Sequence, residues 1–137
     1  KALPMQELFV RKQIPENQNT QDTVFCGGTI VMVWVTNRPL YQKWLKEKIF
    51  PKWKAQYIST WYWLKTTSNV EEEHLVVPLE CEHKKPYECC LVGWIHGNNV
   101  NSAIPVEIVQ NFQTRVLIGS PTEHHSQKPS LSMYLNV

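Results

Sequence analysis

The chain has 137 residues, of which 42% are hydrophobic and 19% are charged, and its formal net charge is +2. This length suffices for one domain with a sizeable core, in which folding hides about 70% of the chain surface, and the composition excludes a disordered tail and a coiled coil. The small net charge does not by itself indicate a polyanionic partner. Asp22 is the only aspartate, which excludes any mechanism that needs two.

For the first 35 residues the sequence predicts a short helix, a surface loop and then one strand. Leu8 and Val10 suggest the apolar side of a short helix over residues 1–10, and the polar residues 11–23 predict a surface loop. Residues 29–35, with the sequence TIVMVWV, are apolar on both faces. This pattern is typical of a central strand that is covered by helices.

The remaining segments alternate between helix and strand patterns. Asn37 can cap a helix and Pro39 suits its first turn, so we expect a helix over residues 39–50 that ends before Pro51. Strands are predicted over residues 55–65, 89–95 and 115–119, and a further helix begins at residue 128. This order predicts an α/β fold.

Polar residues just beyond the strand ends are the candidates for a binding site. In open α/β sheets, ligands bind beyond the carboxyl ends of the strands. These positions are residues 36–38, 65–66 and 121–128. We expect the strand at residues 89–95 to run antiparallel to the others, which brings Glu88, at its beginning, to the same edge.

Several classes of chemistry are disfavoured by the motifs. Gly27-Gly28 precedes a strand, and no P-loop or dinucleotide fingerprint occurs, which argues against ATP and NAD chemistry. No nucleophile elbow is present. The three histidines His83, His124 and His125 match no metal-ligand spacing, so we expect no metal.

The cysteines and the apolar segments bear on the compartment. No C-x-x-C pair and no recognisable disulfide framework occurs, so we expect reduced thiols at Cys26, Cys81, Cys89 and Cys90. No segment has the length of a membrane span, and residues 1–25 lack the apolar block of a secretory signal. We therefore expect an intracellular protein, nuclear or cytoplasmic, with no membrane partner.

A basic stretch with aromatic neighbours allows two interpretations. Five lysines and a single glutamate crowd one short segment: Lys43, Lys46, Lys48, Lys52 and Lys54, with Glu47. They form either a surface that follows phosphates or the solvated face of an amphipathic helix. Trp44 and Trp53 either stack on bases or pack at the rim of the core.

Four segments carry a family resemblance. They are WVTNR at residues 34–38, WYWLKT at 61–66, HKKPYE at 83–88 and SQKP at 126–129. In that order they resemble the methyltransferase-like four branch of the adenine N-6 methyltransferases, relatives of the messenger-RNA adenosine methylase catalytic subunit. The resemblance implies a Rossmann-like methyltransferase fold, a mixed sheet with flanking helices. It also implies transfer of a methyl group from S-adenosylmethionine to the exocyclic amine of adenine in RNA, with DNA as the alternative.

The same resemblance implies roles for six residues. Lys128 corresponds to the lysine that meets the carboxylate of the methyl donor. Trp63, Lys65 and Glu88 would line the acceptor-adenosine side, and His83 and Lys85 would shape the same loop. The simpler interpretations are that Trp63 belongs to the core, that the lysines are solvated, and that Glu88 is a charge at the edge of a strand.

Two departures from the family pattern affect the expected activity. The family's Asp-Pro-Pro-Trp tetrad is absent, because Asp22 lies in a Gln-Asp-Thr sequence. The family also continues beyond SQKP with further donor contacts. We therefore expect residues 1–137 to form a single, truncated methyltransferase domain that carries no catalytic residue and is inactive alone. A partner chain could supply the missing strands. The alternatives are a non-catalytic RNA-binding or scaffold member of the same fold, and an unrelated α/β binding module.

Overall fold

The computed structural model describes residues 9–14, 27–68, 74–97, 103–121, 128–131 and 134. Its centre is a five-stranded sheet with the order β1-β2-β4-β3-β5. The strands are β1 (Phe9–Ile14), β2 (Gly28–Val35), β3 (Ala55–Lys65), β4 (Tyr87–His96) and β5 (Val116–Gly119). The strands that were expected at residues 29–35, 55–65, 89–95 and 115–119 are confirmed as β2 to β5, with small shifts of their ends.

The strand directions place several chain segments at one edge of the sheet. β4 lies between β2 and β3 and is antiparallel to both. β5 is parallel to β3, and β1 is antiparallel to β2. The carboxyl ends of β2, β3 and β5 therefore meet the beginning of β4, which confirms the expected direction of that strand and the mixed α/β sheet.

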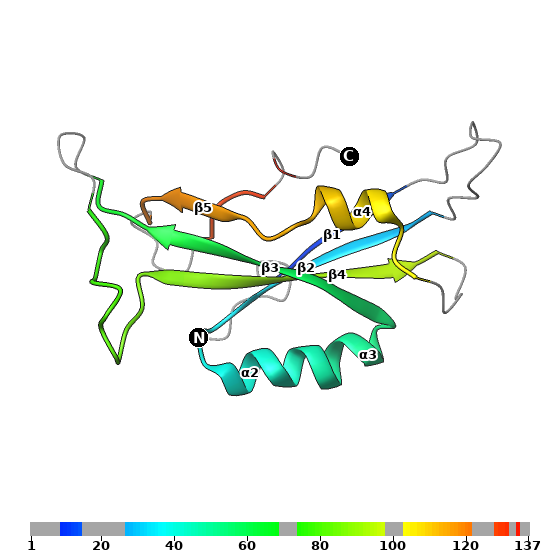
Figure 1. Cartoon of the computed structure of the whole chain (residues 1–137), viewed down its shortest axis with the longest axis horizontal. Helices are drawn as coiled ribbons and strands as arrows, with labels where there is room; N and C mark the ends of the chain where they lie inside the picture. Colours follow the sequence, from blue (N-terminus) through cyan, green and yellow to red (C-terminus); the bar gives the residue numbers. More distant parts are fainter. Residues whose placement is uncertain are drawn as a thin grey trace.

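One continuous helical segment follows β2 and covers one face of the sheet (Figure 1). It consists of α2 (Pro39–Trp44), the π-helical η1 (Leu45–Ile49) and α3 (Phe50–Lys52). The segment runs past Pro51, where we expected it to end. The wider π turn, in which the Phe50 N–H donates to the Leu45 carbonyl, explains this because it relieves the crowding that a proline imposes on a regular helix.

The ends of this helical segment are set by the main chain. Arg38 is the N-cap residue and makes no side-chain capping bond, so the expected cap at Asn37 is wrong. The Asn37 amide instead donates to the Tyr87 carbonyl at the start of β4. At the other end Lys54 adopts φ 56°, a left-handed conformation that ends the helix before β3.

The core is divided between the two faces of the sheet. Under the helical segment, Leu45 and Phe50 pack against Ala55 and Leu91. The opposite face carries a larger cluster rich in tryptophan, to which α4 (Val106–Asn111) contributes Ile108 and β5 contributes Leu117. Figure 1 shows α4 on the other side of the sheet from the helical segment. The members of this larger cluster include Ile30, Met32, Trp34, Trp61, Trp63, Val92, Trp94, Ile108 and Phe112. None of the described helices is long and apolar enough to cross a membrane.

Three expectations about the chain ends and connections are wrong for the described residues. Residues 9–10 were expected in a helix and 11–14 in a loop, but all six belong to β1, which satisfies the outer hydrogen-bonding groups of β2. Residues 128–131 are not helical. Leu131 is instead buried against the core, and the Tyr134 N–H donates to the Leu131 carbonyl at 3.0 Å in a short turn. The rest of these predicted segments lies outside the described residues.

Candidate functional site

Glu88 is the centre of a charged cluster at the edge where the strand ends meet. It is the second residue of β4 and pairs in register with Trp63 of β3. Its carboxylate accepts hydrogen bonds from the Lys128 ammonium at 2.8 Å (Oε1) and 2.7 Å (Oε2). The Lys65 Nζ lies 3.6 Å from Oε1. The structure thus brings three of the predicted site residues together.

This Glu88 cluster is electrostatically unbalanced and partly shielded from water. Among the described residues, two ammonium groups surround this one carboxylate, which leaves the cluster with one net positive charge. The side chains of Lys65, Glu88 and Lys128 are 24%, 26% and 18% exposed. Charge-assisted hydrogen bonds are stronger than neutral ones, and partial burial reduces screening by salt. The cluster can therefore receive an anionic group such as a carboxylate.

Trp63 forms a fixed wall beneath this cluster. The residue is 4% exposed, and its ring packs edge-on against Trp34, with the ring centroids 6.3 Å apart. The indole Nε1 donates to the Gly119 carbonyl at 3.2 Å. The Lys65 ammonium lies 5.1 Å from the centroid of the ring. Trp63 therefore joins β3 to β5 and orients Lys65, and it presents little surface for a stacked base.

The turn after β2 is tied to β4 by a small polar network. The Cys89 thiol donates to the Asn37 Oδ1 at 3.2 Å. The Gln42 Nε2 lies 3.5 Å from the same sulfur and 3.3 Å from the Thr36 carbonyl. Burial raises the pKa of the Cys89 thiol, and the Gln42 hydrogen bond opposes that rise in part. The thiol thus stays protonated at neutral pH and acts as a hydrogen-bond donor.

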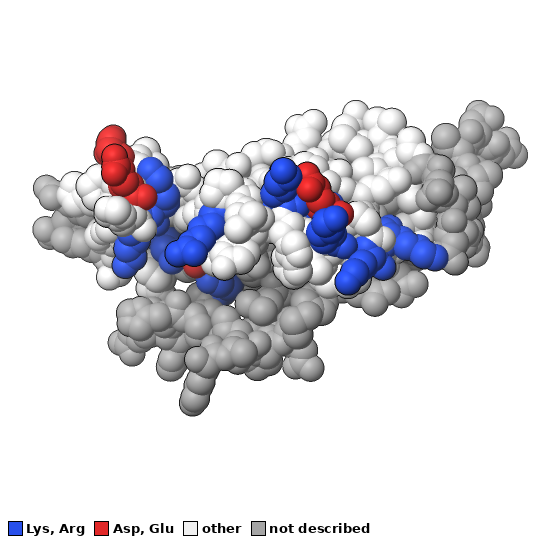
Figure 2. Space-filling view, turned by 90° about the horizontal axis from the view of Figure 1, so that it is seen from below, with Lys and Arg blue, Asp and Glu red and all other residues white. Residues whose placement is uncertain are grey.

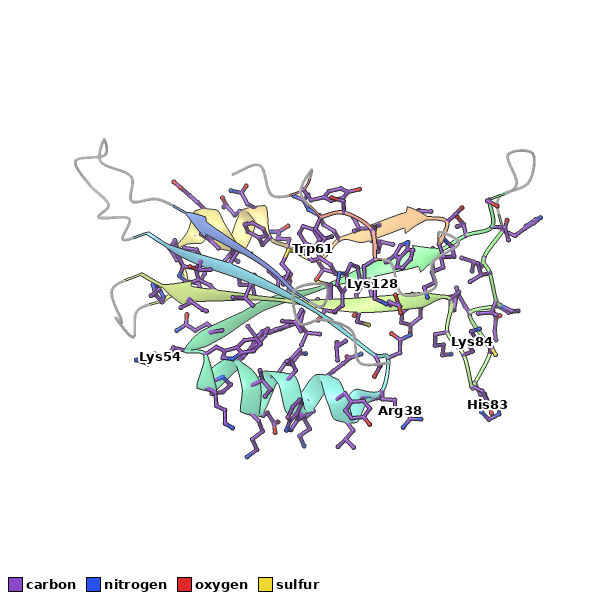
Figure 3. All side chains as sticks on the ribbon, turned by 180° about the vertical axis from the view of Figure 1, so that it is seen from behind. Arg38, Lys54, Trp61, His83, Lys84 and Lys128 are labelled. Atoms are coloured by element: carbon purple, nitrogen blue, oxygen red, sulfur yellow. The ribbon has the colours of Figure 1, made fainter. Side chains whose placement is uncertain are left out.

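His83 and Lys85 do not converge on the Glu88 carboxylate. The Lys85 ammonium donates to the Leu79 carbonyl at 2.9 Å, within its own loop. His83 is exposed, and Figure 3 shows His83 and Lys84 at the outer end of this loop, away from Lys128. The loop lies at the same edge of the sheet as the Glu88 cluster, but His83 and Lys84 stand on the outer side of the loop.

One functional group at this edge has no signal in the sequence. The Gly119 carbonyl accepts hydrogen bonds from Trp63 and from the Thr66 N–H, the latter at 3.1 Å. It thus fixes the end of β3 directly beside Lys65. A main-chain acceptor leaves no residue-type pattern, so only the strand pairing reveals it.

The described residues contain no cluster of three His, Cys, Asp or Glu side chains that could hold a metal ion. His124 and His125 lie outside the described residues. Cys81, Cys89 and Cys90 are free thiols, and Cys26 lies outside the described part of the chain.

Comparison with known proteins assigns the chain to a family. The sequence model of the MT-A70 family matches residues 7–136, which is nearly the whole chain. The chain belongs to the MT-A70 family. The expected kinship with adenine N-6 methyltransferases is thereby confirmed, and so is the α/β methyltransferase fold class.

The curated relatives share about a third of the aligned residues of this MT-A70 chain. It is 33% identical over 112 residues to the N(6)-adenine-specific methyltransferase METTL4 of Mus musculus and 31% identical over 111 residues to that of Homo sapiens. It is 28% identical over 110 residues to the N6-methyladenosine RNA methyltransferase MTA1 of Pyricularia oryzae. The alignments cover 77%, 77% and 78% of this chain, but 22%, 22% and 27% of these relatives. The chain thus spans about a quarter of their length.

Proposed function

We propose that this chain forms part of an adenine N-6 methyltransferase domain that uses S-adenosylmethionine and acts on RNA. Two relatives are named as adenine-specific methyltransferases and one as an RNA methyltransferase. The observation that carries the proposal is the Glu88 cluster, because it places an excess positive charge at the edge of an α/β sheet where ligands bind.

The cluster fits the carboxylate of the methyl donor. An ammonium group has three N–H donors, and Glu88 accepts at most two from Lys128. One N–H donor of Lys128 therefore remains for a ligand. The Lys65 ammonium balances the negative charge that a ligand carboxylate would add to that of Glu88. When bound, S-adenosylmethionine supplies an electrophilic methyl group. Lys128 would hold its carboxylate and exclude other cations from this position.

The acceptor side is assigned to the remaining residues at the same edge. Glu88 and Lys65 offer an acceptor and a donor for the polar edge of an adenine, and Trp63 keeps Lys65 in place. Extruded bases are read by such hydrogen bonds between side-chain walls. His83 and Lys85 would form the outer loop of this side.

We expect no methyl transfer by the 137 residues alone. The family's Asp-Pro-Pro-Trp tetrad is absent, and the single aspartate, Asp22, stands in a different context. The proposal therefore assigns donor and acceptor contacts to this chain but no catalytic residue. Methyl transfer would require a tetrad from outside these residues.

The donor-binding part can be tested without catalysis. Backbone amide shifts of the full chain are recorded by NMR while S-adenosylmethionine is added to ~1 mM, a concentration that detects binding of about −4 kcal/mol. We expect shifts near Glu88 and Lys128 that disappear in Lys128→Met and persist in Lys84→Met, a matched loss of one exposed lysine charge. Shifts that persist in Lys128→Met would contradict the assignment.

The expected inactivity has its own measurement. The chain is incubated with methyl-labelled S-adenosylmethionine and single-stranded RNA or DNA that contains adenine. Incorporation of label by the chain alone would overturn the expectation, and incorporation into DNA in preference to RNA would correct the substrate.

A second candidate function is a non-catalytic RNA-binding member of the same family. The basic stretch at residues 38–54, which holds six Lys and Arg residues and one acidic residue, favours it. It predicts RNA binding that is unaffected by S-adenosylmethionine, together with no amide shifts at Glu88 or Lys128 on addition of the donor.

A further inference from the structure

The positive charge of the chain is concentrated on one helical segment. Residues 38–54 hold six of the 14 Lys and Arg residues but one of the 12 acidic residues. Their net charge is therefore +5, whereas the other 120 residues have a net charge of −3. The six cations are Arg38, Lys43, Lys46, Lys48, Lys52 and Lys54. We call their exposed side the α2 surface.

The α2 surface faces away from the sheet. Five of the six cations are exposed, and the sixth, Lys46, is half-buried because its ammonium lies 4.2 Å above the Tyr57 ring. Figure 2 views the molecule from the side of the helical segment and shows Lys and Arg side chains, in blue, spread along the length of the molecule. In Figure 3 Arg38 and Lys54 mark its two ends. A helix of this length extends about 20 Å, which is enough to follow several nucleotides.

Aromatic rings stand among these cations. Trp44 is 54% exposed and Tyr41 is 45% exposed. These exposed fractions are large for aromatic side chains, which are usually more buried in folded proteins. Both line a cavity of about 440 Å³ between the helix and the end of β2, together with Val33 and Val35. The cavity thus has an apolar floor and two aromatic sides, next to a row of ammonium groups.

This combination favours a single-stranded nucleic acid over other occupants. Proteins that bind single strands combine a positively charged track with aromatic rings on which bases stack. A protein partner is a poorer fit because lysine is depleted at the cores of protein interfaces. A duplex is also a poorer fit, since its stacked bases would leave Tyr41 and Trp44 without a partner.

We propose that the α2 surface binds single-stranded RNA, with its lysines on the phosphates and with Tyr41 and Trp44 stacked against a base. The inference rests on the proposed function for its choice of RNA. The surface lies on the opposite face of the sheet from the Glu88 cluster, since Glu88 and Cys89 alternate along β4 and Cys89 contacts Gln42 of α2. The two meet at one edge, because Arg38 lies three residues beyond the end of β2.

The charge contribution is tested by fluorescence anisotropy with the full chain. A fluorescein-labelled single-stranded RNA of about 12 nucleotides is titrated at several KCl concentrations, without methyl donor. We expect Lys43→Gln/Lys48→Gln/Lys52→Gln to bind about tenfold more weakly or worse, with a salt slope that is smaller by about 2.

The matched control changes the same charge on the other face of the sheet. Gln110→Glu/Gln113→Glu/Thr114→Glu alters three exposed positions in or beside α4 and also lowers the net charge by three. It should keep the salt slope and lose less than about threefold in affinity. Equal weakening by both triple variants would overturn the proposal, as would a wild-type chain that binds no RNA at low salt.

The stacking contribution is tested with a second pair of variants. Trp44→Ala should bind about tenfold more weakly with an unchanged salt slope, because stacking involves no counterion. Leu40→Ala, at a neighbouring position that is 73% exposed, should bind like the wild type. An unchanged affinity in Trp44→Ala would overturn the proposal, and loss of self-association in that variant would then indicate a protein interface. Equally strong binding of a duplex would also overturn it.

These measurements are independent of the methyl donor. Failure of RNA binding would leave the amide shifts at Lys128 as they are. Loss of donor binding would in turn leave the salt slope of RNA binding unchanged.

Discussion

Glu88 joins three segments that lie far apart in the chain. Its carboxylate contacts Lys65 at the end of β3 and Lys128, which is 40 residues further along the chain. Lys128 is followed by Leu131, whose side chain is buried. The ion pair and the apolar anchor together hold residues 128–131 against the sheet in a non-helical conformation.

The Glu88–Lys128 pair should contribute measurably to stability. In a double-mutant cycle with Glu88→Ala and Lys128→Ala, we expect a favourable coupling of about 1–2 kcal/mol, because the pair is charged, close and partly buried. Urea denaturation measures it. The cycle of Glu88 with Lys65, whose nitrogen is 3.6 Å away, should give a smaller value. A coupling near zero for Lys128 would show that the segment is held by Leu131 alone.

Cys90 should make stability depend on alkaline pH. Burial strongly raises the pKa of its thiol in the folded chain, so the folded state keeps the proton that the unfolded chain releases above about pH 8.5. The unfolding free energy is thus unaffected by this group below that pH and falls above it, by up to about 1.4 kcal/mol per pH unit. Urea denaturation between about pH 7 and 10 should show a shallower fall in Cys90→Ala. Parallel curves for the two proteins would contradict this.

At the scale of elements, the helical segment is attached to the sheet by few side chains. Leu45 and Phe50 are its buried residues, whereas Leu40, Tyr41 and Trp44 are exposed. Phe50 lies directly beneath Gly93 of β4, where an added Cβ would be 3.0 Å from its ring. The side of the helix that faces solvent is therefore not needed to hold the helix in place.

Truncation of a buried residue and truncation of an exposed residue of the helical segment should have very different effects on the unfolding free energy. Phe50→Ala should lower the unfolding free energy by about 3–5 kcal/mol, because it leaves a cavity between helix and sheet. Leu40→Ala should change it by less than about 0.5 kcal/mol. Thermal or urea unfolding, followed by circular dichroism, compares the two. A loss in Leu40→Ala that approaches the loss in Phe50→Ala would mean that the outer face is packed.

The elements that were predicted well are those whose pattern reflects burial. β3 was expected at residues 55–65 and lies there, because its aromatic and β-branched residues have one side in the tryptophan cluster. β1 was missed because its sequence, FVRKQI, is polar at its centre and its strand conformation depends on the edge of β2. α4 was missed because its six residues bury only Ile108.

At the scale of the whole molecule, β5 forms one outer edge of the sheet and exposes apolar side chains. Val116 and Ile118 are 58% and 65% exposed. Edge strands of this kind can pair with other chains. We therefore expect the chain to self-associate as its concentration rises.

Lysine substitutions on the β5 edge should prevent this self-association. Val116→Lys/Ile118→Lys should lower the apparent mass in light scattering, and its unfolding free energy should change by less than about 1 kcal/mol. Gln113→Lys/Thr114→Lys adds the same charge before the strand and should associate like the wild type. If both variants reduce association equally, net charge rather than the β5 edge is responsible.

The candidate site was predictable only in part. The rule that ligands bind at strand ends, together with the expected direction of β4, brought Glu88 and Lys65 to one edge. The contact between Glu88 and Lys128 depends on how residues 128–131 lie against the sheet, and the sequence had predicted the start of a helix there. The roles of Trp63, His83 and Lys85 in binding came from the family resemblance and stay predictions.

The central place of β4 also determines when the sheet can form. β2 and β3 are synthesised before β4, but they do not pair with each other, because β4 lies between them in the sheet. The pairing of Gly28 with His96, its partner in β4, can form only after His96 has been synthesised. Pairing over such sequence distances is slow. A nascent chain therefore carries two strands with unpaired edges until β4 has emerged, and unpaired edges of this kind favour aggregation during that interval.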